Sequence, residues 1–298
     1  MDLKRETATD GRFVRQANRF TDLIEEGGPH PPEPGRYQIY ASYACPWAQR
    51  ALIVRELLGL QDVIGVTIVD PIRDERGWRV PGGDPVTGAE FLSELYLATD
   101  PGYQGRYTVP CVWDRTAERL VTNDYPQITL TLETAFAPWH AEGAPDLYPA
   151  ALREEIDALN DTVFHGLNNG VYKAGFATSQ EAYDEAVTGV FATLGLLEER
   201  LSDGRPYLHG EALTESDVRT YTTLARFDAV YHAHFKCGIR RLVDHPALWA
   251  YARRLYAIPA FRDTTDFDHI KRHYYVTQTN INPTGIVPQG PDIDWTAP

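Results

Sequence analysis

The first half of the chain predicts a strand, a helix and a second strand in succession. Residues 37–41 alternate in the manner of a β-strand. After Pro46, apolar side chains recur at helical spacing as far as Leu58, and Gly59 ends the run. The β-branched segment 63–70 predicts the second strand. Strand, helix and strand in this order form the unit of a sheet with parallel neighbours.

The segments that follow extend this pattern. Residues 71–105 are rich in Gly, Pro and Asp, and we expect a long loop there with one short helix at FLSELYL. Further strands are predicted at 108–114 and 119–124, followed by a helix at 126–135. The order β-α-β-(α)-β-β-α is typical of a thioredoxin-like domain.

The second half predicts helices at nearly every step. Apolar residues recur at helical spacing in the segments 152–172, 179–201, 214–231, 245–258 and 264–275. Thr214 and Asp217 form a capping pattern at the start of the third segment, and an extended, proline-rich tail follows from Asn280. We therefore expect an α/β thioredoxin-like N-terminal domain followed by an all-α C-terminal domain. The expected limits are an N-terminal extension at 1–36, the first domain at 37–140 and the second at 148–298.

The composition is that of a globular protein, and it narrows the range of partners. Of 298 residues, 43% are hydrophobic and 23% are charged, and 28 basic against 42 acidic residues give a net charge of −14. Because such a chain has no overall attraction for phosphate backbones or anionic lipid, we expect neither nucleic acid nor a membrane as partner. Three widely spaced cysteines without a CxxC pair make a poor disulfide framework and favour a cytoplasmic protein.

Cys45 is the first candidate for chemistry. It stands in Ala44-Cys45-Pro46-Trp47, where the first strand meets the first helix. The N–H groups that open a helix, and the positive end of its dipole, favour thiolate over thiol and so lower the pKa of a cysteine placed there. Because the motif lacks a second cysteine, we expect an external thiol to resolve the product formed on Cys45. A buried structural cysteine is the alternative.

Val109 and Pro110 open the third predicted strand. A proline at this place in a thioredoxin-like domain is usually cis, and it leaves the N–H and C=O of the preceding residue to pair with an extended peptide. Beside a reactive cysteine, this pair predicts a cradle for a cysteine-containing peptide. An edge-strand proline is the alternative.

Seven segments together resemble the xi class of glutathione transferases, the glutathionyl-hydroquinone reductases. They are YASYACPWAQRALIVRELLGL, Gly77-Trp78, GRYTVPCVWD, NNGVYKAGFA, TLARFDAVYHAHFKC, DFDHIKRHYY and NPTGIVPQGP, between residues 36 and 292. The resemblance implies a thiol-binding thioredoxin-like domain, an all-helical substrate domain and a homodimer formed through the helical domain. It also implies the reaction of glutathione with an S-glutathionyl hydroquinone to give the hydroquinone and oxidised glutathione.

The resemblance implies catalytic roles for single residues as well. Cys45 corresponds to the nucleophile of the family, which uses cysteine where most glutathione transferases use Tyr or Ser. Tyr172 and Tyr274 correspond to aromatic hydroxyls near the aromatic substrate. Tyr275 is an adjacent candidate for substrate binding, and the sequence leaves its direction open.

The thiol site follows the family only in part. Trp78, Arg106 and the backbone of Val109 correspond to residues that hold the glutathione peptide. Where the family has Glu-Ser after the fourth strand, this chain has Asp124-Tyr125. Asp124 keeps a negative charge for an ammonium group, whereas the ring of Tyr125 replaces a small hydroxyl. We therefore expect weak binding of glutathione and a preference for a related thiol such as γ-glutamylcysteine, mycothiol or bacillithiol.

Other clusters are expected to be structural. His269 and His273 have the helical spacing of zinc ligands, but no general-base Glu accompanies them. Lys271 and Arg272 would repel a cation there, so we expect no metal. We expect burial of Cys111 and Cys237, and a helix core made by the stripe Phe227, Tyr231 and Phe235.

These observations predict a thiol-dependent reductase of S-glutathionyl or other S-thiol-conjugated hydroquinones. The reaction would pass through a mixed disulfide on Cys45, with the hydroxyls of Tyr172 and Tyr274 on the ring oxygens. One alternative is a general thiol transferase or dehydroascorbate reductase that uses the same cysteine. Another is a non-catalytic binding scaffold of transferase fold, which the change at Asp124-Tyr125 would favour.

Overall fold

The computed structural model describes residues 6–296, so the first five residues of the extension and the last two of the tail lie outside the described part. The chain forms two compact units. Residues 16–145 make up the first unit, and residues 6–15 join the chain from 146 onward in the second. The domain limits expected from the sequence stay a prediction.

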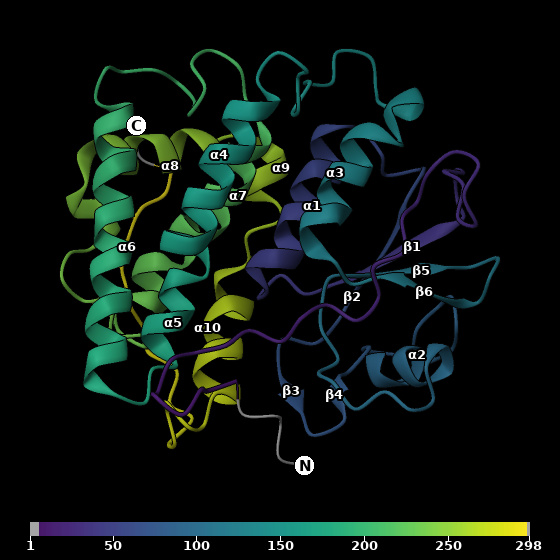
Figure 1. The fold of residues 1–298 in the computed structure, drawn as a ribbon, viewed down its shortest axis with the longest axis horizontal. Helices are drawn as coiled ribbons and strands as arrows, with labels where there is room; N and C mark the ends of the chain where they lie inside the picture. Colours follow the sequence, from purple (N-terminus) through teal and green to yellow (C-terminus); the bar gives the residue numbers. More distant parts are fainter. Residues whose placement is uncertain (1–5, 297–298) are drawn as a thin grey trace. The chain divides into compact units, whose positions relative to one another are not determined.

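A four-stranded mixed sheet forms the centre of the first unit. In chain order the elements are β1 (Tyr37–Ala41), α1 (Pro46–Leu57), β2 (Gly65–Ile68), β3 (Arg73–Asp74), β4 (Gly77–Trp78), α2 (Leu92–Thr99), β5 (Cys111–Asp114), β6 (Arg119–Thr122), α3 (Tyr125–Thr134) and the 3₁₀ turn η1 (Ala137–Trp139). The strand order is β2-β1-β5-β6; β1 is parallel to β2 and antiparallel to β5, and β6 is antiparallel to β5. Helices α1 and α3 lie on one face of the sheet and α2 on the other (Figure 1). The expected α/β thioredoxin-like domain is thus confirmed.

Helices on both faces explain why β1 is buried along its whole length. Helix α1 begins with Pro46, and the chain turns away at Gly59, whose φ of +68° favours glycine. Strand β5 begins at Cys111, later than expected, because Pro110 has no N–H to give to a sheet. The long loop contains the expected helix α2. It also contains the β3–β4 hairpin, whose two-residue strands are too short to produce a periodic pattern.

The N-terminal extension covers the edge of the sheet at β6. Thr21 forms an antiparallel bridge with Thr122 of that strand. Next to the bridge, the backbone N–H of Phe20 donates to Oδ1 of Asn123 at 3.0 Å, and the carbonyl of Phe20 accepts from the N–H of Asn123 at 3.0 Å. The extension thereby pairs with backbone groups of an edge strand, which would otherwise be open to pairing with strands of other molecules.

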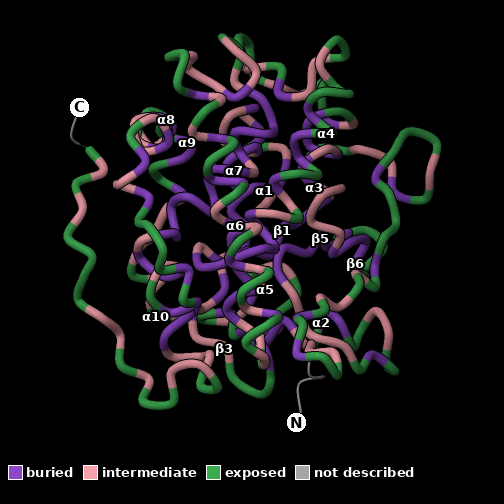
Figure 2. Tube along the Cα trace, turned by 60° about the vertical axis from the view of Figure 1, so that its left-hand side comes forward, coloured by how far each residue is buried: buried purple, intermediate pink, exposed green. Residues whose placement is uncertain are grey.

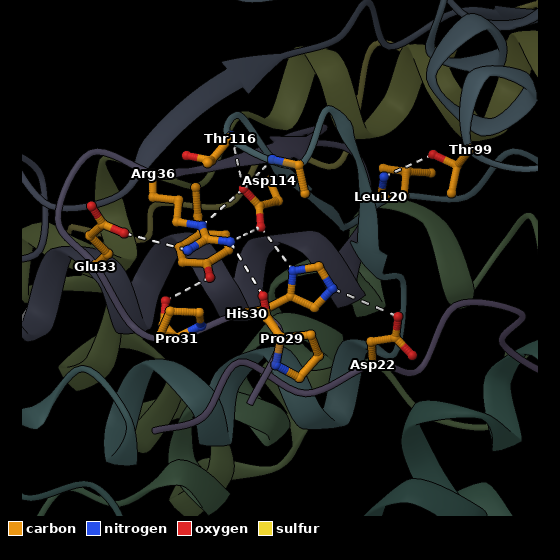
Figure 3. A network of polar contacts seen from close by, with 12 residues as sticks. Asp22, Pro29, His30, Pro31, Glu33, Arg36, Thr99, Asp114, Thr116 and Leu120 are labelled. Carbon is orange, nitrogen blue, oxygen red and sulfur yellow. Dashed lines mark hydrogen bonds and ion pairs between the residues drawn. The ribbon is translucent and has the colours of Figure 1, made fainter. Parts of the chain in front are cut away.

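Asp114, at the end of β5, forms polar contacts with a later part of the extension (Figure 3). Its buried carboxylate accepts two hydrogen bonds from the Arg36 guanidinium at 3.0 and 2.6 Å, and Nδ1 of His30 lies 2.8 Å away. The backbone N–H groups of Thr116 and Ala117 donate to the same carboxylate. Burial raises the pKa of Asp114, but these hydrogen bonds together lower it by more, so the pKa is about 2.

The second unit is helical. Its elements are α4 (Arg153–Val163), the π-turn η2 (Phe164–Asn168), α5 (Gly170–Gly175), α6 (Gln180–Leu201), α7 (Glu215–Arg226), the π-turn η3 (Phe227–Tyr231), the 3₁₀ turn η4 (Leu242–Asp244), α8 (Pro246–Tyr256), α9 (Pro259–Arg262) and α10 (Phe267–Thr277). The expected cap is confirmed, because the carboxylate of Asp217 accepts from the backbone N–H and the hydroxyl of Thr214. As far as residue 296, the tail from Asn280 forms no helix or strand, and its residues are of intermediate burial or exposed (Figure 2).

Two of the expected helices are interrupted by π-turns. The segment 152–172 expected as one helix is divided by η2, and the end of the segment 214–231 is η3 rather than α-helix. At Gly166 in η2, an added Cβ would overlap the Thr193 side chain, so the turn lies directly against α6. Apolar spacing does not distinguish an α-turn from a π-turn, and π-turns are frequent at functional sites.

Candidate active site

Cys45 lies at the start of α1, where the sequence predicts it. It is the N-cap residue, in an extended conformation (φ −83°, ψ 118°), and Pro46 follows at the first helical position. Its Sγ lies 3.2 Å from the carbonyl oxygen of Val109, to which the thiol can donate. The Val109–Pro110 bond is cis, as expected. The structure therefore brings the predicted nucleophile and the predicted peptide cradle together.

The other two thiols are buried inside the protein, as expected. Cys111 lies in β5 and Cys237 in the second unit, and both side chains are fully buried. Burial raises the pKa of Cys237 to about 12 and that of Cys111 further still. All three cysteines are free thiols, and of these Cys45 is the one at a helix N-terminus. This placement favours the ionised sulfur, whereas the two buried sites oppose it.

Side chains of the extension, of α2 and of the loop after α2 hold the segment that leads to Val109. The backbone N–H of Arg106 donates to Oε1 of Gln16 at 3.1 Å, and the carbonyl of Arg106 accepts from the Tyr103 hydroxyl at 2.7 Å. The Tyr96 hydroxyl donates to the carbonyl of Thr108 at 2.8 Å. A backbone held at so many points is suited to pairing with a peptide in one register.

Trp78, the third residue expected to hold the peptide, lies in β4. It pairs with Arg73 in the β3–β4 hairpin, and the Arg73 guanidinium stands 5.6 Å from the centre of its ring. The side chain of Trp78 is 4% exposed. The hairpin therefore fixes the backbone of this residue in a part of the chain expected to be loop.

Asp124 and Tyr125 open α3, a helix of ten residues. Asp124 is the N-cap, and its carboxylate accepts a hydrogen bond from Nδ2 of Asn18 at 3.1 Å. The ring of Tyr125 packs on that of Trp47, with 4.5 Å between the ring centres, and the Arg50 guanidinium lies 4.6 Å from the Trp47 ring. Tyr125 thus contacts the tryptophan that follows Cys45 by two positions, while Asp124 places a carboxylate at a helix start.

Tyr172 and Tyr274 meet inside the second unit. Their hydroxyl oxygens are 2.5 Å apart, and the Tyr231 hydroxyl lies 3.0 Å from that of Tyr274. Tyr275 points elsewhere: its ring contacts His234, with 4.7 Å between the ring centres, and its hydroxyl lies 3.5 Å from the carbonyl oxygen of Ala229. The two adjacent tyrosines therefore point in different directions, and Tyr274 is the one that joins Tyr172.

Tyr231 and the contacts from the extension are what the sequence reasoning missed. Tyr231 is buried, as expected of a helix core, but its hydroxyl belongs to the tyrosine cluster. Its apolar spacing gave no sign of this. Gln16 and Asn18 carry no motif, and they contact residues 90 and 106 positions away in the chain. Pairings at such separations leave no local signal.

The histidines with ligand-like spacing do not form part of a metal site among the described residues. Nε2 of His269 lies 3.7 Å from the carboxylate of Asp266, and within 6–296 no three metal-ligating side chains gather. In the same range, no helix is long and apolar enough to cross a membrane.

Comparison with known proteins places this geometry in a family. Models of the glutathione S-transferase N-terminal and C-terminal domains match residues 44–135 and 180–254. The chain is 46% identical to glutathionyl-hydroquinone reductase YqjG of Escherichia coli K12, over 98% of this chain and 92% of that protein. It is 45% identical to glutathionyl-hydroquinone reductase PcpF of Sphingobium chlorophenolicum, over 95% of this chain and 91% of that protein.

Solved structures of glutathione transferases are also similar to this chain. The xi glutathione transferase of Phanerochaete chrysosporium aligns with a TM-score of 0.94 and 46% identity, covering 97% of this chain and 96% of that one. The glutathione-bound structure of YqjG from Escherichia coli aligns with a TM-score of 0.88 and 44% identity, covering 100% and 98%. The chain therefore belongs to the xi class of the glutathione transferase family.

Proposed function

We propose that the protein is a thiol-dependent reductase of S-glutathionyl hydroquinones that works through a mixed disulfide on Cys45. The observation that carries the proposal is the position of the Cys45 sulfur, at the start of α1 and 3.2 Å from the carbonyl oxygen of Val109. Two relatives, each about 45% identical to this chain, are named glutathionyl-hydroquinone reductases, which supports the choice of substrate.

In the first step the Cys45 thiolate attacks the sulfur that joins the thiol peptide to the aromatic ring. The substrate reacts in its keto form, in which the ring carbon that bears sulfur has gained a proton and the neighbouring oxygen is a carbonyl. A sulfur–sulfur bond forms as the carbon–sulfur bond breaks, and the electron pair restores the aromatic ring and leaves a phenolate. A hydrogen-bond donor on that oxygen stabilises the developing charge.

The tyrosine pair supplies this donor. Tyr172 and Tyr274 carry adjoining hydroxyls, and burial raises the pKa of Tyr274 well above its ordinary value. The phenol is therefore protonated at neutral pH and can donate to a phenolic oxygen of the substrate. This is the part of the reaction that a small disulfide substrate would not need.

In the second step an external thiolate attacks the sulfur of the bound thiol in the mixed disulfide. The attack releases a symmetrical disulfide and regenerates the Cys45 thiolate, which closes the cycle without any other oxidant or reductant. An external thiol is required because Cys111 and Cys237 are both fully buried, and burial raises the pKa of each thiol.

The thiol itself is a low-molecular-weight, cysteine-based thiol. We propose that the backbone of Val109 pairs with its cysteine part, that Trp78 and Arg106 flank it, and that the start of α3 receives the end that is a γ-glutamyl group in glutathione. The N–H groups of a helix start suit a carboxylate, and the Asp124 carboxylate suits an ammonium group. Because Tyr125 stands where the family has serine, we propose that γ-glutamylcysteine, mycothiol or bacillithiol serves better than glutathione. The bound glutathione of the YqjG structure supports a thiol peptide of this kind.

We further propose that the enzyme works in the cytoplasm as a homodimer joined through the helical domain. Three free thiols suit a reducing compartment, and the dimer is the assembly that the xi-class resemblance implies. Light scattering coupled to gel filtration tests the dimer, since elution at the mass of one chain would contradict it.

A comparison of two substrates tests the proposed function. The reduced enzyme is given an external thiol with either an S-glutathionyl hydroquinone or the mixed disulfide of glutathione and 2-mercaptoethanol, and the products are followed by chromatography. We expect release of the free hydroquinone with one oxidised thiol pair per turnover. Turnover of the disulfide alone would instead indicate a general thiol transferase.

A further inference from the structure

Arg15 of the extension lies against Tyr172 in the second unit. Its guanidinium carbon stands 4.8 Å from the centre of the Tyr172 ring and 5.4 Å from that of the Phe13 ring. Its Nε donates at 2.8 Å to Oδ1 of Asn169, the residue that precedes α5. The hydrogen bond and the two rings together hold the guanidinium against the tyrosine that is proposed to meet the aromatic substrate.

Contacts further back along the extension fix the segment that carries Arg15. Gly11 lies against Ser179, the N-cap of α6, where an added Cβ would overlap the serine. The φ of Gly11 is +89°, so glycine suits this close approach in conformation as well as in size. Two positions on, the Phe13 ring stacks on that of Phe176, with 5.4 Å between the ring centres. Arg15 therefore follows a segment that is fixed on the second unit at Gly11 and at Phe13.

Uncharged rings of the second unit pack around Tyr172. They are those of Phe13, Phe176, Tyr231, Phe235 and Tyr274, with 5.3 to 6.5 Å between ring centres. Burial raises the pKa of Tyr231 and Tyr274 well above the ordinary value, so both phenols are protonated at neutral pH. Such surroundings screen a charge less than water does, so the guanidinium of Arg15 acts on nearby oxygens more strongly than an exposed arginine would.

Other titratable side chains near these tyrosines are Arg226, His234 and His273. Arg226 lies at the end of α7 and is fully buried, and its charge acts against the rise in pKa at Tyr231 and Tyr274. The ring centre of His234 is 6.4 Å from that of Tyr274, and burial lowers the pKa of His234, so that imidazole is neutral at neutral pH. Arg226 thus acts on two of the phenols, and Arg15 lies against the third.

We propose that Arg15 is a positioning residue: it holds the Tyr172 ring and places a positive charge near the phenolic oxygen of the aromatic substrate. The inference rests on the proposed function and deepens it, because that function forms a phenolate at Tyr172. As the carbon–sulfur bond breaks, its electron pair passes into the ring and onto the oxygen. The guanidinium attracts this new negative charge without itself gaining or losing a proton. The same charge makes the Tyr172 hydroxyl a stronger donor.

Kinetics of Arg15 variants test the inference, with Arg12→Met as the matched control. Arg12 lies in the same segment, but it is exposed and forms ion pairs with Asp10 at 2.7 Å and Glu185 at 2.5 Å. We expect Arg15→Met to lower kcat for the aromatic conjugate about three- to tenfold, with little change in KM, and to leave turnover of the small mixed disulfide unchanged. Arg15→Gln, which keeps a donor for Asn169 but no charge, should behave like Arg15→Met. Arg15→Lys keeps the charge and should retain most of the rate, and Arg12→Met should retain all of it.

A spectroscopic measurement separates this inference from the proposed function. 4-Nitrophenol has no sulfur to transfer, and its absorbance distinguishes the phenol from the phenolate. We expect Arg15→Met and Arg15→Gln to raise the pKa of the bound probe by about 0.5 to 1, which corresponds to the same three- to tenfold effect. Arg15→Lys and Arg12→Met should leave it close to the wild-type value. If the probe shows this dependence on Arg15 but the wild type leaves the aromatic conjugate intact, the proposed function fails and the charge at Tyr172 stands. The same probe pKa in wild type and Arg15→Met, or an equal loss of kcat on both substrates, would overturn the inference.

Discussion

The Cys45 sulfur lies 3.2 Å from the carbonyl oxygen of Val109 and at the N-terminal end of α1, so two opposed partners face it. The carbonyl oxygen accepts a hydrogen bond from the thiol but repels a thiolate. The helix start does the reverse, since its N–H groups and dipole favour the negative charge. Loss of the proton should therefore favour a position of the sulfur nearer the helix start, which would leave the Val109 carbonyl to the peptide that we propose binds there.

Alkylation of the cysteines at pH 6 checks whether the thiolate forms near neutrality. A pKa one unit below that of an ordinary cysteine gives about ten times more thiolate at this pH. We expect iodoacetamide to modify Cys45 more than about tenfold faster than a free cysteine peptide. Cys237 and Cys111 should stay unmodified, because burial raises the pKa of Cys237 to about 12 and that of Cys111 further. A slow Cys45, no faster than the peptide, would favour a non-catalytic scaffold.

The tyrosine pair should matter for the aromatic substrate more than for a small disulfide. Tyr172→Phe and Tyr274→Phe each remove a hydroxyl from the pair whose oxygens are 2.5 Å apart. We expect each to raise the barrier for reduction of the aromatic conjugate by about 1 to 3 kcal/mol. Tyr275→Phe serves as a comparison, because its hydroxyl faces the carbonyl of Ala229 instead. Equal losses on both substrates would assign the pair a structural role.

The choice of thiol tests the departure at the start of α3. The Asp124 side chain is one methylene shorter than the glutamate of the family, so its carboxylate falls back by about 1.5 Å. We expect glutathione to bind about ten- to a hundredfold more weakly than the preferred thiol, and Asp124→Glu/Tyr125→Ser to improve its use. The measurement is kcat/KM for glutathione, γ-glutamylcysteine, mycothiol and bacillithiol as second substrate. If the wild type already uses glutathione best and the double variant does not improve it, the account of this site is wrong.

The carboxylate of Asp114 should make folding stability depend on acid pH. Its pKa of about 2 lies below the ordinary value of 3.8, so its contribution is present above pH 4 and is lost as the pH falls toward 2. A shift of this size corresponds to about 2 kcal/mol of folding free energy at neutral pH. Asp114→Asn should therefore destabilise the protein by about this amount at pH 7, in urea unfolding, and by less as the pH approaches 2.

Asp203→Asn is the matched control for that experiment. Asp203 also pairs with an arginine, Arg205, and the hydrogen bonds from Arg205 lower its pKa to about 2. Because this pair is on the surface, solvent screens it and its loss should change stability little. A similar pH dependence in both variants would contradict the role assigned to the buried network.

Local signals predicted the elements that place Cys45. A strand followed by a proline-started helix positions Cys45, and a proline at the start of β5 marks Val109 beside it, so both sides of this contact could be read from neighbouring residues. Tyr172 and Tyr274 came only from the family resemblance. They lie 102 positions apart, and no periodic pattern records which hydroxyls meet.

The contacts that the sequence did not predict join residues far apart in the chain, or involve turns that have no periodic pattern of apolar residues. Asn18 reaches Asp124 from the extension, and Tyr231 joins the tyrosine cluster through a π-turn that apolar spacing does not distinguish from an α-turn. A stripe of aromatic residues is typical of a helix core, so the sequence pattern does not distinguish the Tyr231 hydroxyl from others. Its contact with the Tyr274 hydroxyl is seen only in the structure.

Trapping of the covalent intermediate tests the central claim most directly. Reduced enzyme is mixed with excess S-glutathionyl hydroquinone in the absence of any other thiol, and the intact protein and its peptides are examined by mass spectrometry. We predict release of one hydroquinone per active site and one glutathionyl group on Cys45, which a second thiol then removes. Cys45→Ser should give neither, whereas Cys237→Ala should give both. Release of hydroquinone without an adduct on Cys45, or turnover by Cys45→Ser close to that of the wild type, would contradict the account.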